Sequence, residues 1–506
     1  MTEARRNPRI LVVTPEVTYL PDRMGNLAHY LTAKAGGLAD VSAALISALF
    51  EQGADVHVAL PDYRSIFRDR LAPFLKKEQK AIFEVMPDDR LHLVKDRAFF
   101  YLNQIYAGSG LENTKLSLTF QRDVLNYIVP QVKPDLIHCN DWMTALIPAM
   151  ARELDIPCLF TIHNIHTVRC PLSHIEDRGI DAASFWKHLY FDRVPHSYEE
   201  SRETNSLDFL TSGIFAAHFV NTVSPTFLRE IIEERHDFVE PSIRRELTSK
   251  YNADCAFGIL NAPDPAFDPA GDKTLARSYG PDDHAAAKPE NKVHLQELLG
   301  LAKDPDAALF FWPSRLDPVQ KGCRLLSEII YEMISAFWYD TLQVVFVANG
   351  PYQSVFQNIA RFHGLEERMA VCDFDERLEH MAYAAADFVL MPSRFEPCGL
   401  PQMIGPIYGA LPVAHDTGGI HDTVVHLDVA RERGNGFLFE YFDGPGLFWA
   451  VKEAMKFHKL PPEVRDAQIR RIMVHARETF THGRTAREYI RLYEKMLQRP
   501  LITSYA

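Results

Sequence analysis

The sequence predicts an α/β protein made of two Rossmann-like halves, each with a parallel sheet and flanking helices. Short apolar runs that end in polar residues alternate with helical segments over 9–224 and again over 308–419. A proline-rich stretch, 257–272, separates the two series and has the composition of a linker. A strand, a glycine-rich turn, a helix and a second strand in that order form a parallel βαβ unit.

The first half opens with such a unit, whose helix is expected over 36–53 because its leucines and valine recur at helical spacing. Its expected strands are apolar runs with polar ends: 9–16, 55–61, 135–141, 158–164 and 219–224. Residues 142–153 read as a helix for which Asp141 is a candidate N-cap. The stretch PHSYEESRETNSLD, 195–208, reads as a mobile acidic loop. The order of elements within 61–134 does not follow from the pattern.

The second half repeats the alternation. Its expected strands are 308–315, 342–350, 369–375, 387–394 and 411–419. Helices are expected over 322–338 and 376–386. The amphipathic stretch 485–498 has no strand after it, so it must dock on an existing surface, and in a two-lobed molecule it can cross back to the first lobe. The expected domains are therefore 1–258, 259–484 and a returning segment 485–506.

Composition and length narrow the class of protein. A chain of 506 residues favours two or three domains, and 47% hydrophobic with 24% charged residues is typical of a globular protein. The net charge of −13 argues against nucleic acid as a partner. Seven scattered cysteines without a C-x-x-C pair read as reduced thiols rather than zinc ligands. No stretch approaches the roughly 20 apolar residues of a membrane helix, so a cytoplasmic protein is expected.

Several polar residues at the ends of strands are candidates for chemistry. Lys34 stands two residues before Gly36 and Gly37, which open a helix, and this combination suits a diphosphate, although two glycines before a helix are more often just a tight turn. Arg315 and Lys321 follow a strand of the second half, where two cations can neutralise a leaving diphosphate. The alternative is that Arg315 and Lys321 are ordinary surface cations in a solvated loop.

The same contrast holds for the other candidates. His163 can be a hydrogen-bonded core residue, Asp141 a helix cap, Glu396 a surface acid and Cys398 a small buried residue. Their common position favours a functional interpretation. All of them follow strands, and an open α/β sheet binds its ligands beyond the carboxyl ends of its strands.

The chain resembles the bacterial glycogen synthases and plant starch synthases, which transfer glucose from a nucleotide sugar to an α-1,4-glucan. The resemblance runs over most of the chain and rests on these motifs: KAGGLADV (34–41), HCNDW (138–142), TIHN (161–164), FGILNAPD (257–264), PSRFEPCGL (392–400) and YGALPVAHDTGGIHDTV (408–424). It implies a GT-B fold, with two Rossmann-like domains facing a cleft and a last helix that crosses back. It also implies a transfer that retains configuration and needs no metal or cofactor.

The resemblance implies a role for each matching residue. The catalytic set would be His163, Arg315, Lys321 and Glu396. The donor, ADP-glucose or UDP-glucose, would be held by Lys34, Gly36, Gly37, Asp40, Asn261, Phe374, Cys398, Gly399 and Leu400. Asp40 would position the loop that carries Lys34, and Phe374 would stack on the base. Asp141 and Asn164 would line the sugar and acceptor side.

The chain departs from the family at several of these sites. Seventeen residues, Val17–Ala33, stand where the family typically has only a few, and this insertion is expected to act as a lid or to reshape the acceptor groove. The loop RLDPVQKG is one residue longer than the family's R-L-x-x-Q-K-G. Whether the Lys321 side chain extends to the donor is therefore open at this level. Other departures are Ala35 for Thr, Pro263 in NAPD, His415 for Arg and Pro401 for a common Thr. Gly405 and Pro406 are expected to shorten or kink the helix that Pro401 opens.

Three functions therefore stay open at this level. The first is a glucan synthase that uses ADP-glucose or UDP-glucose. The second is a related glycosyltransferase with another donor or acceptor. The third is a glucan-binding homologue without turnover, which the joint presence of His163, Arg315, Lys321 and Glu396 argues against.

Overall fold

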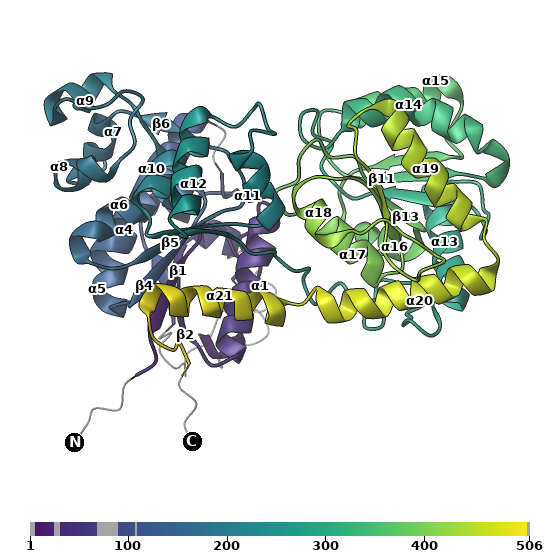
Figure 1. The fold of residues 1–506 in the computed structure, drawn as a ribbon, viewed down its shortest axis with the longest axis horizontal. Coiled ribbons are helices and arrows are strands. Elements are labelled where there is room, and N and C mark those ends of the chain that lie inside the picture. Colours follow the sequence, from purple (N-terminus) through teal and green to yellow (C-terminus); the bar gives the residue numbers. More distant parts are fainter. Residues whose placement is uncertain (1–5, 25–30, 68–89, 107–108, 503–506) are drawn as a thin grey trace. The chain divides into compact units, whose positions relative to one another are not determined.

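The computed structural model describes residues 6–24, 31–67, 90–106 and 109–502. Contacts divide the chain into two compact units (Figure 1). Unit 1 comprises Met1–Asn261 with His482–Ala506, and unit 2 comprises Ala262–Thr481. Within the described ranges, no helix is both long and apolar enough to span a membrane.

Unit 1 is built on a parallel sheet with the strand order β3-β2-β1-β4-β5-β8-β9. The strands are β1 Arg9–Val13, β2 Asp55–Pro61, β3 Leu91–Val94, β4 Leu136–Asn140, β5 Cys158–Ile162, β8 Phe219–Thr222 and β9 Ala256–Gly258. The central pair, β1 and β4, runs from Ile10 opposite Leu136 to Val13 opposite Cys139. Every residue of β4 and β5 is buried, as a strand covered on both faces requires.

The helices of unit 1 are α1 Gly37–Glu51, α3 Arg97–Phe100, α4 Gly110–Asp123, α5 Val129–Val132, α6 Ile147–Ala151, α7 Leu172–Glu176, α8 Ala182–Phe185, α9 Tyr198–Thr204, α10 Phe209–Ala216, α11 Pro225–Ile232, α12 Pro241–Asn252 and α21 His482–Leu497. The last of these, α21, packs beside α1 (Figure 1). Two buried hydrogen bonds hold it to the sheet: Tyr493 Oη lies 2.8 Å from Nδ1 of His138, and Asn221 donates to Tyr489 Oη. The returning helix predicted from the sequence is confirmed.

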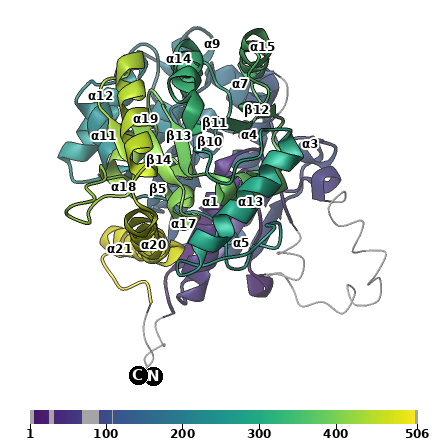
Figure 2. The same ribbon diagram turned by 90° about the vertical axis from the view of Figure 1, so that its right-hand side faces the viewer.

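Unit 2 is built on a second parallel sheet with the order β12-β11-β10-β13-β14-β15. Its strands are β10 Leu309–Trp312, β11 Gln343–Val347, β12 Met369–Cys372, β13 Phe388–Met391, β14 Leu411–His415 and β15 Phe437–Phe439. Its helices are α13 His284–Leu299, α14 Cys323–Ala336, α15 Gln353–His363, α16 Glu376–Ala385, α17 Pro401–Ile407, α18 Gly418–Thr423, α19 Gly444–His458 and α20 Pro462–Thr479. In Figure 2, α14, α15 and α19 lie on one side of the strands and α13, α17 and α20 on the other. The predicted α/β class with two parallel-sheet halves is confirmed.

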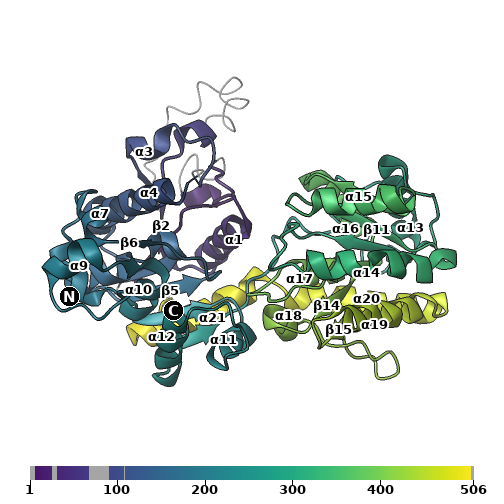
Figure 3. The ribbon, with the colours of Figure 1, turned by 90° about the horizontal axis from the view of Figure 1, so that it is seen from above.

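Two local predictions in unit 1 are wrong. The stretch 195–208 is not a loop: it contains α9, whose first turn is capped by the Ser197 hydroxyl accepting from the Glu200 amide. Figure 3 shows α9 beside α7, to which Arg202 and Tyr198 bond through Glu176. The Ser-x-x-Glu spacing was the signal for this helix.

The helix expected over 142–153 is broken instead into a 3₁₀ turn at Trp142–Thr144, α6, and a second 3₁₀ turn at Arg152–Leu154. Pro148 stands within the first two positions of α6, where proline favours a helix start. The strand expected over 219–224 ends at Thr222, and Ser224 caps α11 by accepting from the Phe227 amide. The predicted effect of Gly405 and Pro406 is confirmed, because α17 ends at Ile407.

Candidate functional site

The strand order of each sheet reverses beside its first strand. In unit 1 the chain winds from β1 outward to β3 and then returns to place β4 on the other side of β1, and in unit 2 β10 and β13 have the same relation. Ligands of open α/β sheets bind at such switch points, beyond the carboxyl ends of the strands. A binding site is therefore expected among the residues that follow these four strands.

In unit 2, the loop after β10 and the loop after β13 meet in an ion pair. Nζ of Lys321 lies 2.6 Å from Oε2 of Glu396, and only 13% and 5% of the two side chains are exposed. Ser393 donates a second hydrogen bond to the same carboxylate oxygen, at 3.1 Å. A cation and an acid, both largely withdrawn from water, are thus held at the switch point of this sheet.

Backbone contacts fix the distance between the two loops. The Arg394 amide donates to the Gln320 carbonyl at 2.8 Å. Gly322 has φ +75°, and a Cβ there would lie 1.8 Å from the Pro392 carbonyl oxygen, so only glycine permits this approach. Within the loop after β10, the Asp317 carboxylate accepts from the amides of Val319 and Gln320. Lys321 reaches Glu396 in spite of the longer loop.

The end of β14 and the first turn of α18 also bond to the segment around Glu396. The Gly419 amide donates to the Glu396 carbonyl at 2.9 Å, and a Cβ at Gly419 would lie 2.0 Å from the Cys398 carbonyl oxygen. His415, the residue that replaces the common Arg, is buried and bonds through Nδ1 to the Ser393 carbonyl. Its imidazole therefore holds the turn that presents Glu396.

The remaining predicted residues of unit 2 lie at the same sheet edge. Arg315 follows β10 with an exposed side chain, and Phe374 follows β12, 47% exposed, with its amide bonded to Asn349. Cys398 is buried, and Gly399 has φ +73°. Leu400 caps α17, and Pro401 occupies its first turn, as predicted. Among the described residues, no hydrogen bond or ion pair joins Arg315 or Phe374 to the Lys321–Glu396 pair.

In unit 1, the loop between β1 and α1 is held by two carboxylates. Glu16 is buried and accepts from the amides of Ala35 at 2.7 Å and Gly36 at 3.0 Å. Asp40 pairs with Lys34, with 2.9 Å between Nζ and Oδ2, and accepts from the Thr18 hydroxyl at 2.6 Å. Glu16 thus fixes the backbone of the glycine turn, while Asp40 fixes the direction of the Lys34 side chain.

The loops after β4 and β5 meet around Asp141. Its carboxylate accepts from the His163 amide at 2.7 Å and from the Asn164 side chain at 3.5 Å. Burial raises the pKa of Asp141 to about 7. Asp141 has φ +57° and makes no side-chain bond to the turn that follows it, so its interpretation as a helix cap is wrong. The carboxylate instead organises the His163–Asn164 turn.

The His163 ring is oriented by its neighbour on β4. Its Nε2 lies 3.0 Å from Oδ1 of Asn140, and desolvation lowers the pKa of His163 to about 3. The imidazole is therefore neutral at physiological pH. Asn261, the last residue of this part of unit 1, is buried, and its Oδ1 has no hydrogen-bond partner among the described residues.

The insertion after Glu16 is closed at its base. Val17 and Ala33 exchange two backbone hydrogen bonds, of 2.9 and 2.8 Å, and Thr32 donates to the Thr18 carbonyl. Residues 25–30 of this segment lie outside the described residues, so a lid role stays a prediction. The base of the segment is continuous with the Lys34 loop.

The sequence reasoning missed four residues that shape these sites: Glu16, Tyr106, Asn140 and Ser393. Glu16 and Asn140 stand at or just after strand ends, which was the signal used for the other candidates. Tyr106, which donates to Glu16 Oε1 at 2.9 Å, lies in a stretch whose order the pattern did not resolve. Ser393 precedes Glu396 by three residues, and only the turn brings its hydroxyl to the carboxylate.

Comparison with known proteins places the chain among enzymes of glucan synthesis. The family described as the starch synthase catalytic domain matches residues 9–241, and the family described as glycosyl transferases group 1 matches residues 307–456. A glycogen synthase of Thermotoga maritima is 33% identical over 500 residues, covering 92% of this chain and 96% of the relative. A glycogen synthase of Bacillus subtilis is 30% identical over 486 residues, covering 92% and 95%.

Solved structures share the fold. The catalytic domain of starch synthase IV from Arabidopsis thaliana, solved with ADP and acarbose, has a TM-score of 0.78 at 24% identity and covers 98% of this chain and 100% of that chain. A sucrose-phosphate synthase from Thermosynechococcus elongatus has a TM-score of 0.56 at 16% identity, covering 97% and 100%. At these identities the likeness shows the fold, which glycosyltransferases with different acceptors have in common.

Proposed function

Because this chain belongs to the glycogen synthase family of glycosyltransferases, we propose that it transfers glucose from ADP-glucose or UDP-glucose to the non-reducing end of an α-1,4-glucan, with retention of configuration. The observation that carries the proposal is the buried Lys321–Glu396 pair at the switch point of unit 2. Two related structures support a nucleotide-sugar donor. The Arabidopsis starch synthase was solved with ADP, and the Anabaena protein HepE with UDP.

Unit 2 is proposed to hold the donor. Arg315 and Lys321 bind the diphosphate and stabilise the charge that develops on it as the glycosidic bond breaks. Glu396 binds hydroxyls of the transferred glucose, and the backbone at Gly399 and Leu400 binds the phosphates. Cys398 is part of the same turn, and Phe374 stacks on the base. The exposed ring of Phe374 and the exposed Arg315 are accessible for these roles.

Residues of unit 1 are proposed to contribute to donor binding, to contact the transferred glucose and to bind the acceptor. Lys34, Gly36 and Gly37 contribute to donor binding on the loop that Glu16 and Asp40 hold, and Asn261 contributes the buried carbonyl oxygen described above. His163 contacts the transferred glucose, and because its Nε2–H donates to Oδ1 of Asn140, the Nδ1 atom of the neutral ring is left to accept one hydrogen bond. Asp141 and Asn164 line the acceptor side.

The chemical step replaces one bond by another at the anomeric carbon. The bond from that carbon to the diphosphate oxygen breaks, and a bond to the 4-hydroxyl of the glucan forms on the same face. The hydroxyl proton leaves with the nucleoside diphosphate. The two cations of unit 2 are suited to stabilise this leaving group without a metal ion.

We also propose that the protein acts in the cytoplasm. All seven cysteines are free thiols. Free thiols are the rule in reducing compartments, which supports a cytoplasmic site for the reaction.

One assay separates the proposal from its alternatives. The purified protein is incubated with glucose-labelled ADP-glucose or UDP-glucose and glycogen, and label in polymer and free nucleotide are both measured. The proposal predicts label in polymer and an equal release of nucleoside diphosphate. Release of nucleotide without labelled polymer would instead indicate another acceptor, and glycogen binding without release would indicate a binding protein.

A further inference from the structure

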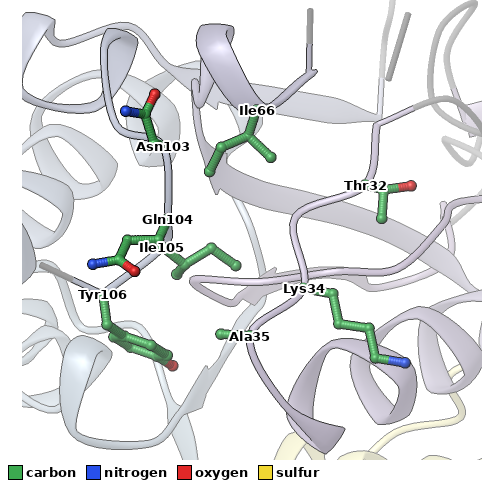
Figure 4. Close-up of a pocket in the computed structure, with 8 residues that line it drawn as sticks. All are labelled: Thr32, Lys34, Ala35, Ile66, Asn103, Gln104, Ile105 and Tyr106. Carbon is green, nitrogen blue, oxygen red and sulfur yellow. The ribbon is translucent and has the colours of Figure 1, made fainter. Parts of the chain in front are cut away.

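In each unit, one buried polar side chain holds the backbone of a loop that is assigned to donor binding. In unit 1 this residue is Glu16, whose carboxylate accepts from the amides of Ala35 and Gly36. Figure 4 shows Ala35 and Tyr106 among the residues that line a pocket at this loop. In unit 2 the corresponding residue is Gln402, which none of the roles proposed above uses.

Gln402 lies in the first turn of α17, and its side chain is fully buried. Its Nε2 donates to the carbonyl oxygens of Cys398 at 2.9 Å and Gly399 at 3.1 Å. Thr423 Oγ1 accepts from the same nitrogen at 3.1 Å and gives its own hydrogen to the Gly419 carbonyl. Because carbonyl oxygens only accept, the nitrogen of the Gln402 amide must face them, and the orientation of this amide is fixed.

The two carbonyls that Gln402 binds set the direction of two N–H groups. In a planar trans peptide, the C=O and the N–H point in opposite directions. The Cys398 carbonyl shares its peptide with the Gly399 amide, and the Gly399 carbonyl shares its peptide with the Leu400 amide. Both N–H groups therefore point away from the buried Gln402 side chain. Gly399 and Leu400 are partly exposed, and their amides donate to no other described residue.

The contact between Gln402 and the turn depends on a glycine. Gly399 has φ +73°, and a Cβ there would lie 2.4 Å from Oε1 and 2.9 Å from Nε2 of Gln402. Oε1 of Gln402 has no hydrogen-bond partner among the described residues. A buried acceptor without a partner opposes folding, so this side chain is not explained by a contribution to stability.

We propose that Gln402 is a positioning residue for the donor: it directs the Gly399 and Leu400 amides at the diphosphate of the nucleotide sugar. The inference rests on the proposed function, which assigns these two amides to the phosphates. It adds the side chain that sets their direction before the donor binds, so the donors need no reorganisation at binding. Gln402 acts through the backbone and is not itself a ligand of the phosphates.

The test compares Gln402→Met with the wild type in calorimetric titrations of the full chain with ADP and with UDP. Methionine is close to glutamine in length and volume but has no N–H, so it releases both carbonyls. The dissociation constant of the nucleotide that binds more tightly is expected to rise by a factor of about ten or more. In transfer assays, the donor KM should rise by a similar factor, kcat should fall less, and KM for glycogen should stay unchanged.

The matched control is Gln296→Met in α13. Gln296 is also fully buried in unit 2, and its Nε2 donates to the Asp304 carbonyl at 2.8 Å and to Gln343 Oε1 at 2.9 Å. This variant should lose stability as Gln402→Met does but keep the nucleotide affinity of the wild type. A second variant, Gln402→Glu, keeps the shape and, as a buried carboxylic acid, one O–H donor. Its nucleotide affinity should lie between those of the wild type and Gln402→Met.

Equal nucleotide affinity in the wild type and Gln402→Met would overturn the role of Gln402 and leave the proposed function standing. Equal weakening in Gln402→Met and Gln296→Met would overturn it too, because the effect would then be one of general stability. If Gln402→Met does not fold, Gln402→Glu decides: about threefold weaker binding supports the role, and wild-type affinity overturns it.

The nucleotide titrations do not depend on turnover. If the wild type transfers no glucose but Gln402→Met weakens nucleotide binding as expected, the proposed function fails while the role of Gln402 stands. A wild type that binds neither ADP nor UDP would overturn both.

Discussion

The ammonium of Lys321 lies 2.6 Å from the Glu396 carboxylate, in surroundings that leave 13% and 5% of the two side chains exposed. The pair joins the loop after β10 to the loop after β13. Because both groups are largely desolvated, removal of one partner leaves the other as an uncompensated charge. Function and stability are therefore linked at this pair, and experiments must measure both.

We predict that Lys321→Ala lowers kcat for glucosyl transfer by a factor on the order of 10² to 10³, because a preorganised charge for the leaving diphosphate is lost. The same change should lower the free energy of unfolding by about 3–5 kcal/mol. The control is Lys303→Ala, which removes a surface cation paired with Glu297 and should cost less than about 1 kcal/mol. Thermal unfolding and steady-state kinetics check the two effects, and wild-type kcat in Lys321→Ala would refute the assigned role.

Gly322 offers a test of the backbone contact that brings the two loops together. Gly322→Ala combines a left-handed φ of +75° with a Cβ 1.8 Å from the Pro392 carbonyl oxygen, so we expect a loss of at least about 3 kcal/mol in unfolding free energy. Gly300→Ala is the matched control, since its φ is +71° and nothing lies within 4 Å of the added Cβ. It should cost only about 1 kcal/mol. Equal losses in the two variants, measured by chemical denaturation, would mean that the close approach does not exist.

The sequence predicted the order of the elements well because burial on both faces of a parallel sheet leaves long apolar runs, as in β4 and β5. It also indicated Lys321, Glu396, Asp141 and His163 as candidates, since all of them follow strands, and their roles stay predictions. It could not reveal that Glu16 holds the glycine turn or that Tyr106 bonds to Glu16, because these contacts join residues 19 and 90 positions apart. The prediction of a loop over 195–208 was wrong because the density of charged residues there was given more weight than the capping signal of Ser197.

Glu16 should act on the reaction only through the Lys34 loop. Glu16→Ala frees the amides of Ala35 and Gly36, so we expect the donor KM to rise by a factor of roughly ten while kcat falls less. Glu51→Ala, an exposed acid at the end of α1, is the control and should leave both constants unchanged. A Glu16→Ala enzyme with wild-type donor KM would show that the loop does not need this carboxylate.

Asp141 should make stability depend on pH near neutrality. Burial raises its pKa to about 7, above the ordinary value of 3.8, so the folded chain keeps a proton that the unfolded chain has released. The wild type therefore loses stability as pH rises from about 4 through about 7. The variant Asp141→Asn carries no such charge. Its unfolding free energy relative to wild type should increase across this window, by up to about 4 kcal/mol. A difference that does not change with pH in denaturation curves would contradict the assignment.

Pro401 in the first turn of α17 has no N–H to donate. Pro401→Thr restores an amide and adds a hydroxyl next to the segment assigned to the donor phosphates. We expect the dissociation constant of ADP to fall by a factor of about ten or more, since a hydrogen bond to a charged group contributes about 1.5–3 kcal/mol. Unchanged or weaker binding would indicate that the phosphates lie elsewhere.

The most direct test of the central claim is the linkage of the transferred glucose. Glycogen labelled by the purified protein with radioactive ADP-glucose or UDP-glucose is digested with β-amylase, which removes maltose from the non-reducing ends of α-1,4 chains. The account predicts that nearly all of the incorporated label is released as maltose. Polymer without label from either donor, or label that resists this digestion, would contradict it.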